Sequence, residues 1–502
     1  MTEASASAGD VAGPSSPSGR RQVAGRAAAY AGLNALPRAI GFLMLPVYTR
    51  VLGPSEYGRM SIAMAIFTIA TLVMTAGVEL SIFRSWFRLE GDRRAQMEFI
   101  HSTWVFLIVY PFCLAAVLGS ASLLIGGGFT LSGTELGLTF FAAAAQISSS
   151  TLPNSVARAQ EDLKKYALLS TTTTVPMVGF AVLFVVVFHW GVGGWIGSII
   201  VAQLIALACS LFIVPWQRGV PVVRKPIIES IRFGIPMVAH YSFGWALNLS
   251  DRLILTGLVT ASAIGVYSLG ANLAMPVMVL VMAIHQACAP AYARHGANGS
   301  SADALAKTMH AQVAAVSWIA MSAALLGPPL VGIMAPPAFG QAREVVVWIA
   351  LAYGFLGLNL IPTSLATLTG DRNGMMWAAT ACGAAVDIVL LIVWVPTGGI
   401  RAAAIATAAG YATVFVGLCL FWQLVKGDIE VPASAKRVLA TVATAGATFS
   451  AGALLIADTG IAALALRAVI ATVGGVAILA LGIGQVDALR TLGRRGETPT
   501  SG

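Results

Sequence analysis

Arg38 stands out in the sequence because it lies near the middle of an apolar run at 27–49. An arginine at the centre of a bilayer costs about 2.5–3.5 kcal/mol even on lenient insertion scales, so it should face water or a partner. Its planar guanidinium can hold a phosphate group by two parallel hydrogen bonds, where a lysine offers only a point charge. We therefore predict that Arg38 binds an anion, with nearby Asn34 as a polar residue of the same cavity. The alternative is a structural ion pair with a helix carboxylate such as Asp387.

Asp251 and Arg252 form a second charged position, inside the apolar run at 228–259. Neighbouring residues of a helix point about 100° apart, so the two side chains should contact different neighbours. Asn248 lies three residues before Asp251, on the same helix face. One member of the pair can face a cavity while the other braces the fold, and the sequence leaves both interpretations open.

Two further charges each allow two roles. Asp387 lies mid-span in the run at 374–396. A carboxyl group in a medium of low dielectric constant holds a proton until an opposite charge approaches, as a proton relay requires. The alternative is a neutral acid that donates to a carbonyl group. Arg50, beyond the first run, is by default an anchor whose charge reaches the membrane surface, and it can also line the mouth of a cavity.

The composition shows which elements must position these side chains. Apolar residues make up 57% of the 502 residues and charged residues only 10%, and the mean hydropathy is +0.82. Soluble proteins carry roughly 25% charged residues, so the main solvent of this chain is lipid. Runs long enough to span a bilayer occur at 27–49, 59–83, 97–125, 130–152, 166–189, 192–215, 228–259, 262–291, 304–334, 343–369, 374–396, 400–425, 435–457 and 460–484. A spanning helix needs about 20 apolar residues, so we predict about fourteen transmembrane helices.

The distribution of basic residues predicts the orientation. If the N-terminus is cytoplasmic, most of the 30 Lys and Arg residues fall in segments on the cytoplasmic side. This alternation agrees with the positive-inside rule along the whole chain, and one miscounted helix would destroy it. We therefore expect a multi-pass protein of the bacterial inner membrane with both termini in the cytoplasm.

A faint internal repeat suggests how the helices are grouped. The segment 52–61 follows the first run and the segment 259–268 follows the seventh, and at one constant offset they share Ser55/Ser262, Gly58/Gly265 and Ser61/Ser268. An even number of helices separates the copies, so they run in the same direction, as in parallel transporter repeats. The predicted fold is an all-α polytopic membrane protein with two six-helix lobes in parallel pseudo-repeat and two C-terminal helices. The predicted domains are a disordered cytoplasmic tail at 1–25, an N-lobe at 26–215, an inter-lobe loop at 216–227, a C-lobe at 228–426, two further helices at 427–484 and a cytoplasmic tail at 485–502.

Several functions lack the motifs that they require. The sequence contains no GxxxxGK[ST], HExxH or GxSxG motif and no His/Cys cluster, so neither nucleotide hydrolysis nor a metal or other cofactor is expected. The basic stretches contain no interleaved aromatics, which argues against a nucleic-acid partner. The loops predicted outside are too short for the catalytic domain of a membrane glycosyltransferase or polymerase. We expect a protein that is not an enzyme.

Two segments resemble a known family. The segment 38–58, RAIGFLMLPVYTRVLGPSEYG, closely resembles the opening signature of the bacterial polysaccharide and O-antigen flippases. These proteins are part of the multidrug/oligosaccharidyl-lipid/polysaccharide exporter superfamily. The segments 248–252 (NLSDR) and 264–268 (IGVYS) look like the second recurring segment of that family. Chain length and the predicted helix number agree with the family along essentially the whole sequence.

The resemblance implies a two-lobed bundle that takes an undecaprenyl-pyrophosphate-linked oligosaccharide from the inner to the outer leaflet, driven by an ion gradient. On this basis Arg38, Arg252 and Arg50 would hold the pyrophosphate, and Asp387 or Asp251 would couple transport to protons or sodium. The implied partners are the lipid-linked oligosaccharide, membrane lipids, and a polymerase and glycosyltransferases of the same pathway. Two alternatives stay open: a multidrug-type cation antiporter on the same fold, and a membrane polymerase or glycosyltransferase.

Overall fold

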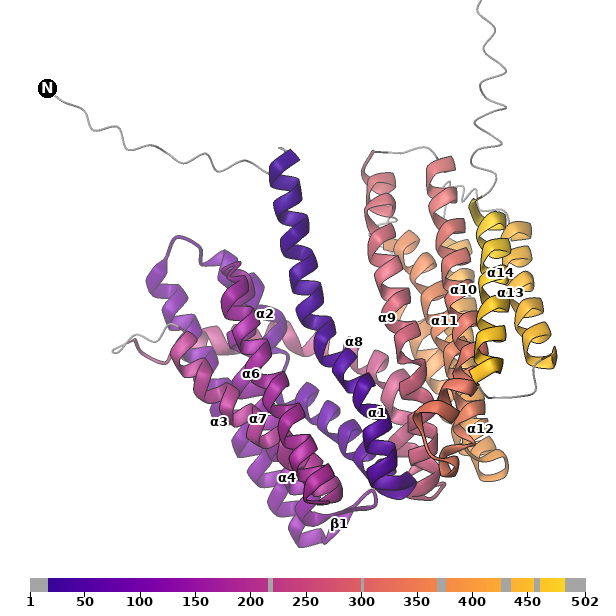
Figure 1. Ribbon diagram of the computed structural model, residues 1–502. Coiled ribbons are helices and arrows are strands. Elements are labelled where there is room, and N and C mark those ends of the chain that lie inside the picture. The colour runs from indigo at the N-terminus through magenta and orange to yellow at the C-terminus, as the bar shows by residue number, and fades with distance from the viewer. Residues whose placement is uncertain are drawn as a thin grey trace, which may run out of the picture. The chain divides into compact units, whose positions relative to one another are not determined.

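A computed structural model describes residues 17–214, 220–298, 302–367, 376–425, 435–455 and 461–483 (Figure 1). The helices and strands follow in chain order. They are α1 (Pro17–Met74), α2 (Val78–Arg88), α3 (Arg93–Ile125), β1 (Gly127–Gly128), β2 (Leu131–Ser132), α4 (Gly133–Gln146), the π-helix η1 (Ile147–Thr151), α5 (Leu152–Ala159), α6 (Leu163–Ala181), the π-helix η2 (Val182–Val187), α7 (Gly191–Ile213), α8 (Arg224–Leu255), α9 (Ala261–Asn298), α10 (Ala302–Met334), the 3-10 helix η3 (Pro337–Phe339), α11 (Ala342–Thr367), α12 (Met376–Val425), α13 (Ala435–Leu455) and α14 (Ile461–Ile483).

The all-α polytopic fold class is confirmed. Where the structure describes them, the apolar runs of the sequence lie mainly on helices, and the one sheet among the described residues is the short β1–β2 hairpin. Within the described ranges, nine helical segments are long and apolar enough to cross a membrane. Nine is lower than the predicted fourteen partly because α1 and α12 each contain two of the predicted spans and count once.

Two glycines interrupt the long helices. Gly53 in α1 has φ 68° and ψ 176°, and Gly399 in α12 has φ 58° and ψ −150°. Such positive φ values are accessible to glycine because it has no Cβ. The halves of α12 then pack antiparallel, since Gly383 approaches Gly410 and Gly417 approaches Ala379 across the hairpin. Gly399 therefore lies at the turn between two predicted spans.

The chain divides into two compact units. Unit 1 contains residues 1–44, 70–120 and 137–235, and unit 2 contains residues 45–69, 121–136 and 236–502. These boundaries differ from the predicted lobes because both units contain segments of each lobe. In unit 1, Gly77 of the α1–α2 connection and Gly234 of α8 touch through their backbones, and Arg88 pairs with Glu229 at 2.9 Å. Such close contacts associate the start of α8 with unit 1.

The ends of two helices also differ from the predicted segments. Helix α1 begins at Pro17, so part of the segment 1–25 predicted as a disordered tail is helical. Residues 18–28 contain arginine, glutamine and several alanines, which favour helix, and proline is well suited to a first helical position. Helix α8 begins at Arg224, inside the predicted inter-lobe loop 216–227. The predicted tail at 485–502 lies outside the described residues.

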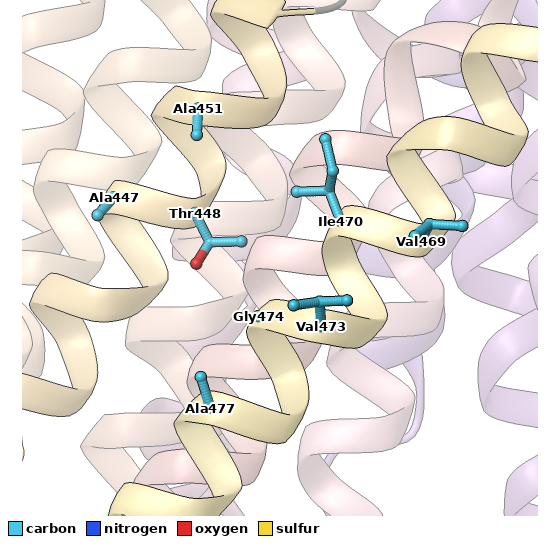
Figure 2. Close-up of a pocket in the computed structure, with 8 residues that line it drawn as sticks. All are labelled: Ala447, Thr448, Ala451, Val469, Ile470, Val473, Gly474 and Ala477. Carbon is cyan, nitrogen blue, oxygen red and sulfur yellow. The ribbon is translucent and has the colours of Figure 1, made fainter.

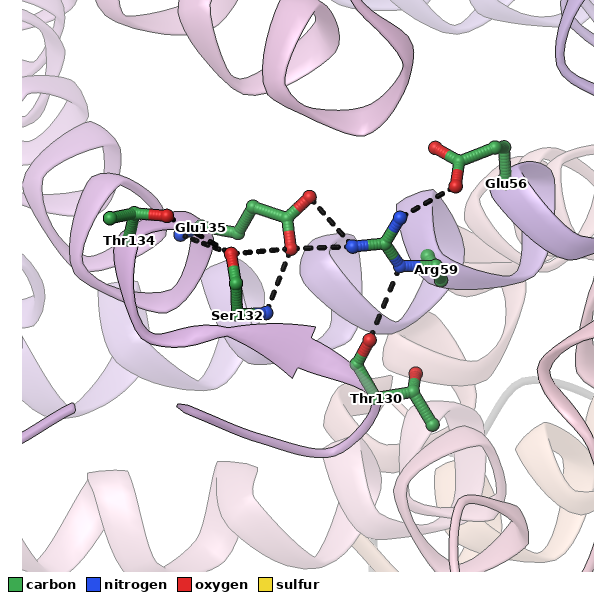
Figure 3. A network of polar contacts seen from close by, with 6 residues as sticks. All are labelled: Glu56, Arg59, Thr130, Ser132, Thr134 and Glu135. Carbon is green, nitrogen blue, oxygen red and sulfur yellow. Dashed lines mark hydrogen bonds and ion pairs between the residues drawn. The ribbon is translucent and has the colours of Figure 1, made fainter. Parts of the chain in front are cut away.

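In unit 2, an ion-pair network fixes the β1–β2 hairpin (Figure 3). The Arg59 guanidinium of α1 donates to both carboxylate oxygens of Glu135 at 2.6 and 2.8 Å, and to Glu56 at 2.5 Å. Its Nε donates to the carbonyl oxygen of Thr130 at 3.2 Å. The Glu135 carboxylate also accepts from the backbone N–H of Ser132, so one side chain joins α1, the hairpin and the start of α4.

Helices α13 and α14 pack on α10. The indole N–H of Trp318 donates to the carbonyl oxygen of Ala471 at 3.0 Å, and Arg467 donates to the carbonyl oxygen of Leu325 at 3.1 Å. A methyl group on Gly475 would collide with the Trp318 ring, so glycine permits this close approach. The appended helices are therefore integral to unit 2.

Asp162 caps the N-terminus of α6 in unit 1. Its carboxylate accepts a hydrogen bond from the backbone N–H of Lys165 at 3.0 Å, and this bond, with the nearby Lys165 charge, lowers the pKa of Asp162. A lowered pKa stabilises the folded state above the ordinary carboxyl pKa and loses that effect as the pH falls through the folded value. We expect Asp162→Ala to lower the thermal unfolding midpoint slightly at pH 7, and the difference from wild type to shrink as the pH falls below the ordinary carboxyl pKa. A difference that does not shrink in acid would contradict a contribution from the ionised Asp162 carboxylate.

Candidate functional site

Arg38 lies on an unpacked part of α1. Residues 35–39 are all exposed, and five residues cover more than one helical turn, so no face of this segment is buried. No ion pair of Arg38 occurs among the described residues. Because an arginine exposed to lipid is energetically unfavourable, this placement indicates that water surrounds the side chain. The Asn34 side chain lies outside the described residues.

Arg50 is exposed and contacts the end of α10. Its guanidinium donates to the carbonyl oxygen of Ile333 at 3.1 Å and to that of Pro46 at 3.4 Å. The buried hydroxyl of Thr49 donates to the carbonyl oxygen of Met334 at 3.2 Å. These bonds satisfy carbonyl groups at the helix end and link α1 to α10 within unit 2.

Asp251 and Arg252 are both buried in unit 2, each about 5% exposed. The hydroxyl of Tyr267 donates to the Asp251 carboxylate, which also accepts from the backbone N–H of Arg252 at 2.7 Å. The Arg252 guanidinium instead donates to Ser268 at 3.3 Å and to the side-chain oxygen of Asn272 at 3.2 Å. The two side chains thus contact different residues of α9. The interior position of Arg252 favours the bracing role. The Asn248 side chain lies outside the described residues.

Asp387 lies close to this pair. It is 1% exposed on α12, and its Oδ1 has no hydrogen-bond partner among the described residues. It is near enough to Asp251 and Tyr267 for electrostatic interaction with both. The Thr407 hydroxyl, on the other half of α12, lies 3.4 Å from that of Tyr267. Helices α8, α9 and α12 therefore bring two carboxyl groups into one buried region.

Two buried carboxyl groups in a medium of low dielectric constant cannot both carry charge without compensation. The neighbouring Arg252 compensates one charge, and a proton or small cation can compensate the other. Among the described residues, no group of three or more His, Cys, Asp or Glu side chains could hold a metal ion.

Sequence reasoning missed four polar partners, Tyr57, Tyr267, Asn272 and Thr407. Ser268 and Asn272 are four residues apart and so form one polar stripe on α9, and the adjacent Tyr267 points in a different direction. A search of α9 for polar residues at helical spacing could have found that stripe. Tyr57 and Thr407 join it only through the tertiary fold.

The two copies of the repeated segment meet in unit 2. A methyl group on Gly58 would overlap the carbonyl oxygen of Ala261, and one on Gly265 would overlap the carbonyl oxygen of Pro54. These contacts are reciprocal, since Pro54 precedes Gly58 by four residues as Ala261 precedes Gly265. We call this contact the Gly58–Gly265 crossing. It has the symmetry expected of two equivalent segments related by a twofold axis.

A groove of about 460 Å³ lies between α13 and α14 (Figure 2). Its lining is apolar apart from the Thr448 hydroxyl, and consists of Ala447, Thr448, Ala451, Val469, Ile470, Val473, Gly474 and Ala477. None of the charged candidate residues lines this groove, so it is separate from the sites that the sequence predicts.

Comparison with known proteins places these features in a family context. The sequence profile described as "Polysaccharide biosynthesis protein" matches residues 26–295. The "Lsg locus putative protein 1" of Haemophilus influenzae is 22% identical over 269 residues. That match covers 50% of this chain and 61% of the relative, so less than two thirds of the relative's length is aligned.

Solved structures share the fold. "Lipid II flippase MurJ, inward closed conformation" aligns with a TM-score of 0.72 at 10% identity, over 92% of this chain and 99% of that chain. An "inward-facing conformation of a multidrug resistance MATE family transporter of the MOP superfamily" aligns with a TM-score of 0.57 at 13% identity. That alignment covers 79% of this chain and all of the other. At these identities the likeness shows the fold alone.

Proposed function

The chain belongs to the polysaccharide biosynthesis protein family, and we propose that it carries an undecaprenyl-pyrophosphate-linked oligosaccharide from the inner to the outer leaflet by alternating access. The coarser statement, a multi-pass membrane protein of flippase or transporter type, follows from the family and the fold. The observation that best supports the finer one is Arg38, exposed on an unpacked segment in the middle of a predicted span. A guanidinium there can meet an anionic headgroup in a wet passage.

The buried acidic region supplies the driving force in this proposal. Asp251 and Asp387 bind a coupling proton or sodium ion, and the gradient of that ion drives transport. The Oδ1 of Asp387 supports this assignment because it is buried and accepts no hydrogen bond from the described residues, so it is available to a proton or cation. Arg38 and Arg50 hold the pyrophosphate, while Arg252 contributes by fixing the acidic region in place.

The proposed function also specifies the membrane in which the protein lies and the enzymes with which it works. It is a transporter and not an enzyme, it lies in the bacterial inner membrane, and both termini are cytoplasmic. The glycosyltransferases of the same pathway supply its substrate, because the sugar must be complete on its lipid before it crosses. A polymerase on the outer side uses the product.

The deciding experiment is a deletion strain complemented with the wild-type gene. Without the protein, we expect lipid-linked repeat units to accumulate in the inner leaflet, where an impermeant sugar oxidant cannot reach them, and surface polysaccharide to disappear. Complementation should restore both. Normal surface polysaccharide in the deletion strain would remove this protein from the pathway.

The second candidate is a multidrug-type cation antiporter. The buried pair Asp251 and Asp387 favours it, because a cationic substrate calls for acidic residues. Efflux of a cationic dye from wild-type but not from deletion cells, with surface polysaccharide unchanged, would support this function instead.

A further inference from the structure

A continuous chain of side-chain hydrogen bonds joins α1 to α8 through one residue of α9. The side-chain amide of Asn272 donates to the hydroxyl oxygen of Tyr57 at 2.8 Å. The side-chain oxygen of the same residue accepts from the Arg252 guanidinium at 3.2 Å. The side chain of Asn272 thus donates to Tyr57 and accepts from Arg252, and Arg252 is next to Asp251 in the sequence.

Tyr57 lies at the Gly58–Gly265 crossing. It is fully buried, immediately precedes Gly58, and packs edge-on against Phe339 with ring centroids 5.8 Å apart. Gly58 and Gly265 meet through their backbones and have no side chains that could hold the two helices together. The bond between Tyr57 and Asn272 is therefore a polar link that can hold the crossing closed.

Loss of the hydrogen bond between Tyr57 and Asn272 would be unfavourable because Tyr57 is fully buried and Asn272 is half-buried. If Arg252 moved away, the side-chain oxygen of Asn272 would lose its partner, and a reoriented amide could no longer donate to Tyr57. A buried tyrosine hydroxyl without a partner destabilises the packing around it. A change at the Asp251–Arg252 pair would then be felt at the crossing.

We infer that Asn272 is a positioning residue that couples the Asp251–Arg252 pair to the opening and closing of the Gly58–Gly265 crossing. This inference rests on the proposed alternating-access function, in which contacts between the repeated segments must open and close during transport. It assigns to Tyr57 and Asn272 a role in transmission and not in substrate contact.

The test measures opening of the crossing directly in the purified full-length protein. The native cysteines (Cys113, Cys209, Cys288, Cys382 and Cys419) are replaced, and Ser61→Cys is introduced as a reporter. Ser61 is 4% exposed and lies on the helix face of Pro54 and Gly58, so opening should expose it. The readout is the rate at which a small water-soluble thiol reagent labels this cysteine.

We expect Asn272→Leu and Tyr57→Phe each to raise the labelling rate by roughly 2- to 10-fold, the effect of one hydrogen bond on an opening equilibrium. The double variant should show no more than the larger single effect, because both changes break the same bond. Gly58→Leu, in which the added side chain prevents closure of the crossing, gives the upper limit of the labelling rate.

Asn359→Leu is the matched control. It removes a buried asparagine of α11 that donates to the Tyr411 carbonyl oxygen. Asn359 does not belong to the series of hydrogen bonds from Tyr57 through Asn272 to Arg252.

Transmission is tested by combination. Asp251→Asn should change the labelling rate when Tyr57 is present and leave it unchanged in the Tyr57→Phe background. Equal effects in the two backgrounds, or labelling by Tyr57→Phe at the wild-type rate, would overturn the inference. The readout needs no substrate, so it can succeed even if the deletion strain keeps its polysaccharide, and the two failures are distinguishable.

Discussion

Replacement of Arg38 by alanine is expected to abolish surface polysaccharide while the protein accumulates to normal levels in the membrane. The guanidinium is exposed, and residues 35–39 around it are all exposed, so its removal leaves no buried cavity and no unpaired partner among the described residues. A loss of function would therefore reflect a lost contact with substrate. The measurement is surface polysaccharide in the complemented deletion strain, with immunoblotting for protein level.

Two further variants make this prediction specific. Arg38→Lys keeps the charge but loses the two parallel hydrogen bonds, so we expect partial function. Arg401→Ala is the control, because Arg401 is an exposed arginine with its side chain 62% accessible, paired to Glu344 at 3.4 Å. Surface pairs of this kind contribute about 0–1 kcal/mol, so this strain should retain polysaccharide. Normal polysaccharide in Arg38→Ala would remove Arg38 from the mechanism.

Asp387→Asn is expected to produce the second large effect, a loss of gradient-driven transport. The substitution keeps the shape of the side chain but removes its capacity to bind and release a proton or sodium ion. Coupling free energies between sites are typically about 1–3 kcal/mol, so we expect a decrease of about 5- to 150-fold in gradient-dependent transport. The measurement is uptake of a lipid-linked oligosaccharide by proteoliposomes with and without an imposed ion gradient.

The comparison with a surface carboxylate separates coupling from general electrostatics. Glu344→Gln removes a carboxylate whose side chain is 57% exposed and should leave transport intact. Asp387→Asn should exchange substrate at the same slow rate as wild type when no gradient is imposed. Equal stimulation by the gradient in Asp387→Asn and wild type would exclude Asp387 as the coupling residue.

Most of the fold could be predicted from the sequence because the hydropathy that drives membrane insertion is local. The described parts of the apolar runs are mainly helical, since backbone groups in lipid must bond within their own segment. The repeat was also visible, because Gly58 and Gly265 permit a close backbone approach that no other residue allows. The grouping into units was not predictable, since it depends on contacts such as Gly77 with Gly234.

The candidate site was predictable only in part. Charges within apolar runs mark Arg38, Asp251, Arg252 and Asp387 as unusual, because a charge inside a span is unfavourable unless it meets water or a partner. The direction in which each side chain points depends on its neighbours. Arg252, predicted to bind pyrophosphate, lies in the interior with Ser268 and Asn272, while Arg38 is exposed.

The sequence by itself determined that this chain crosses a membrane many times, which segments do so, and which buried charges need an explanation. Only the tertiary structure decided that Asp251 and Asp387 share one buried region and that Asn272 joins Arg252 to Tyr57. The physical reason is the range of the interactions. Hydrophobic insertion acts on about 20 consecutive residues, whereas a hydrogen bond joins groups only a few ångströms apart in space and far apart in the chain.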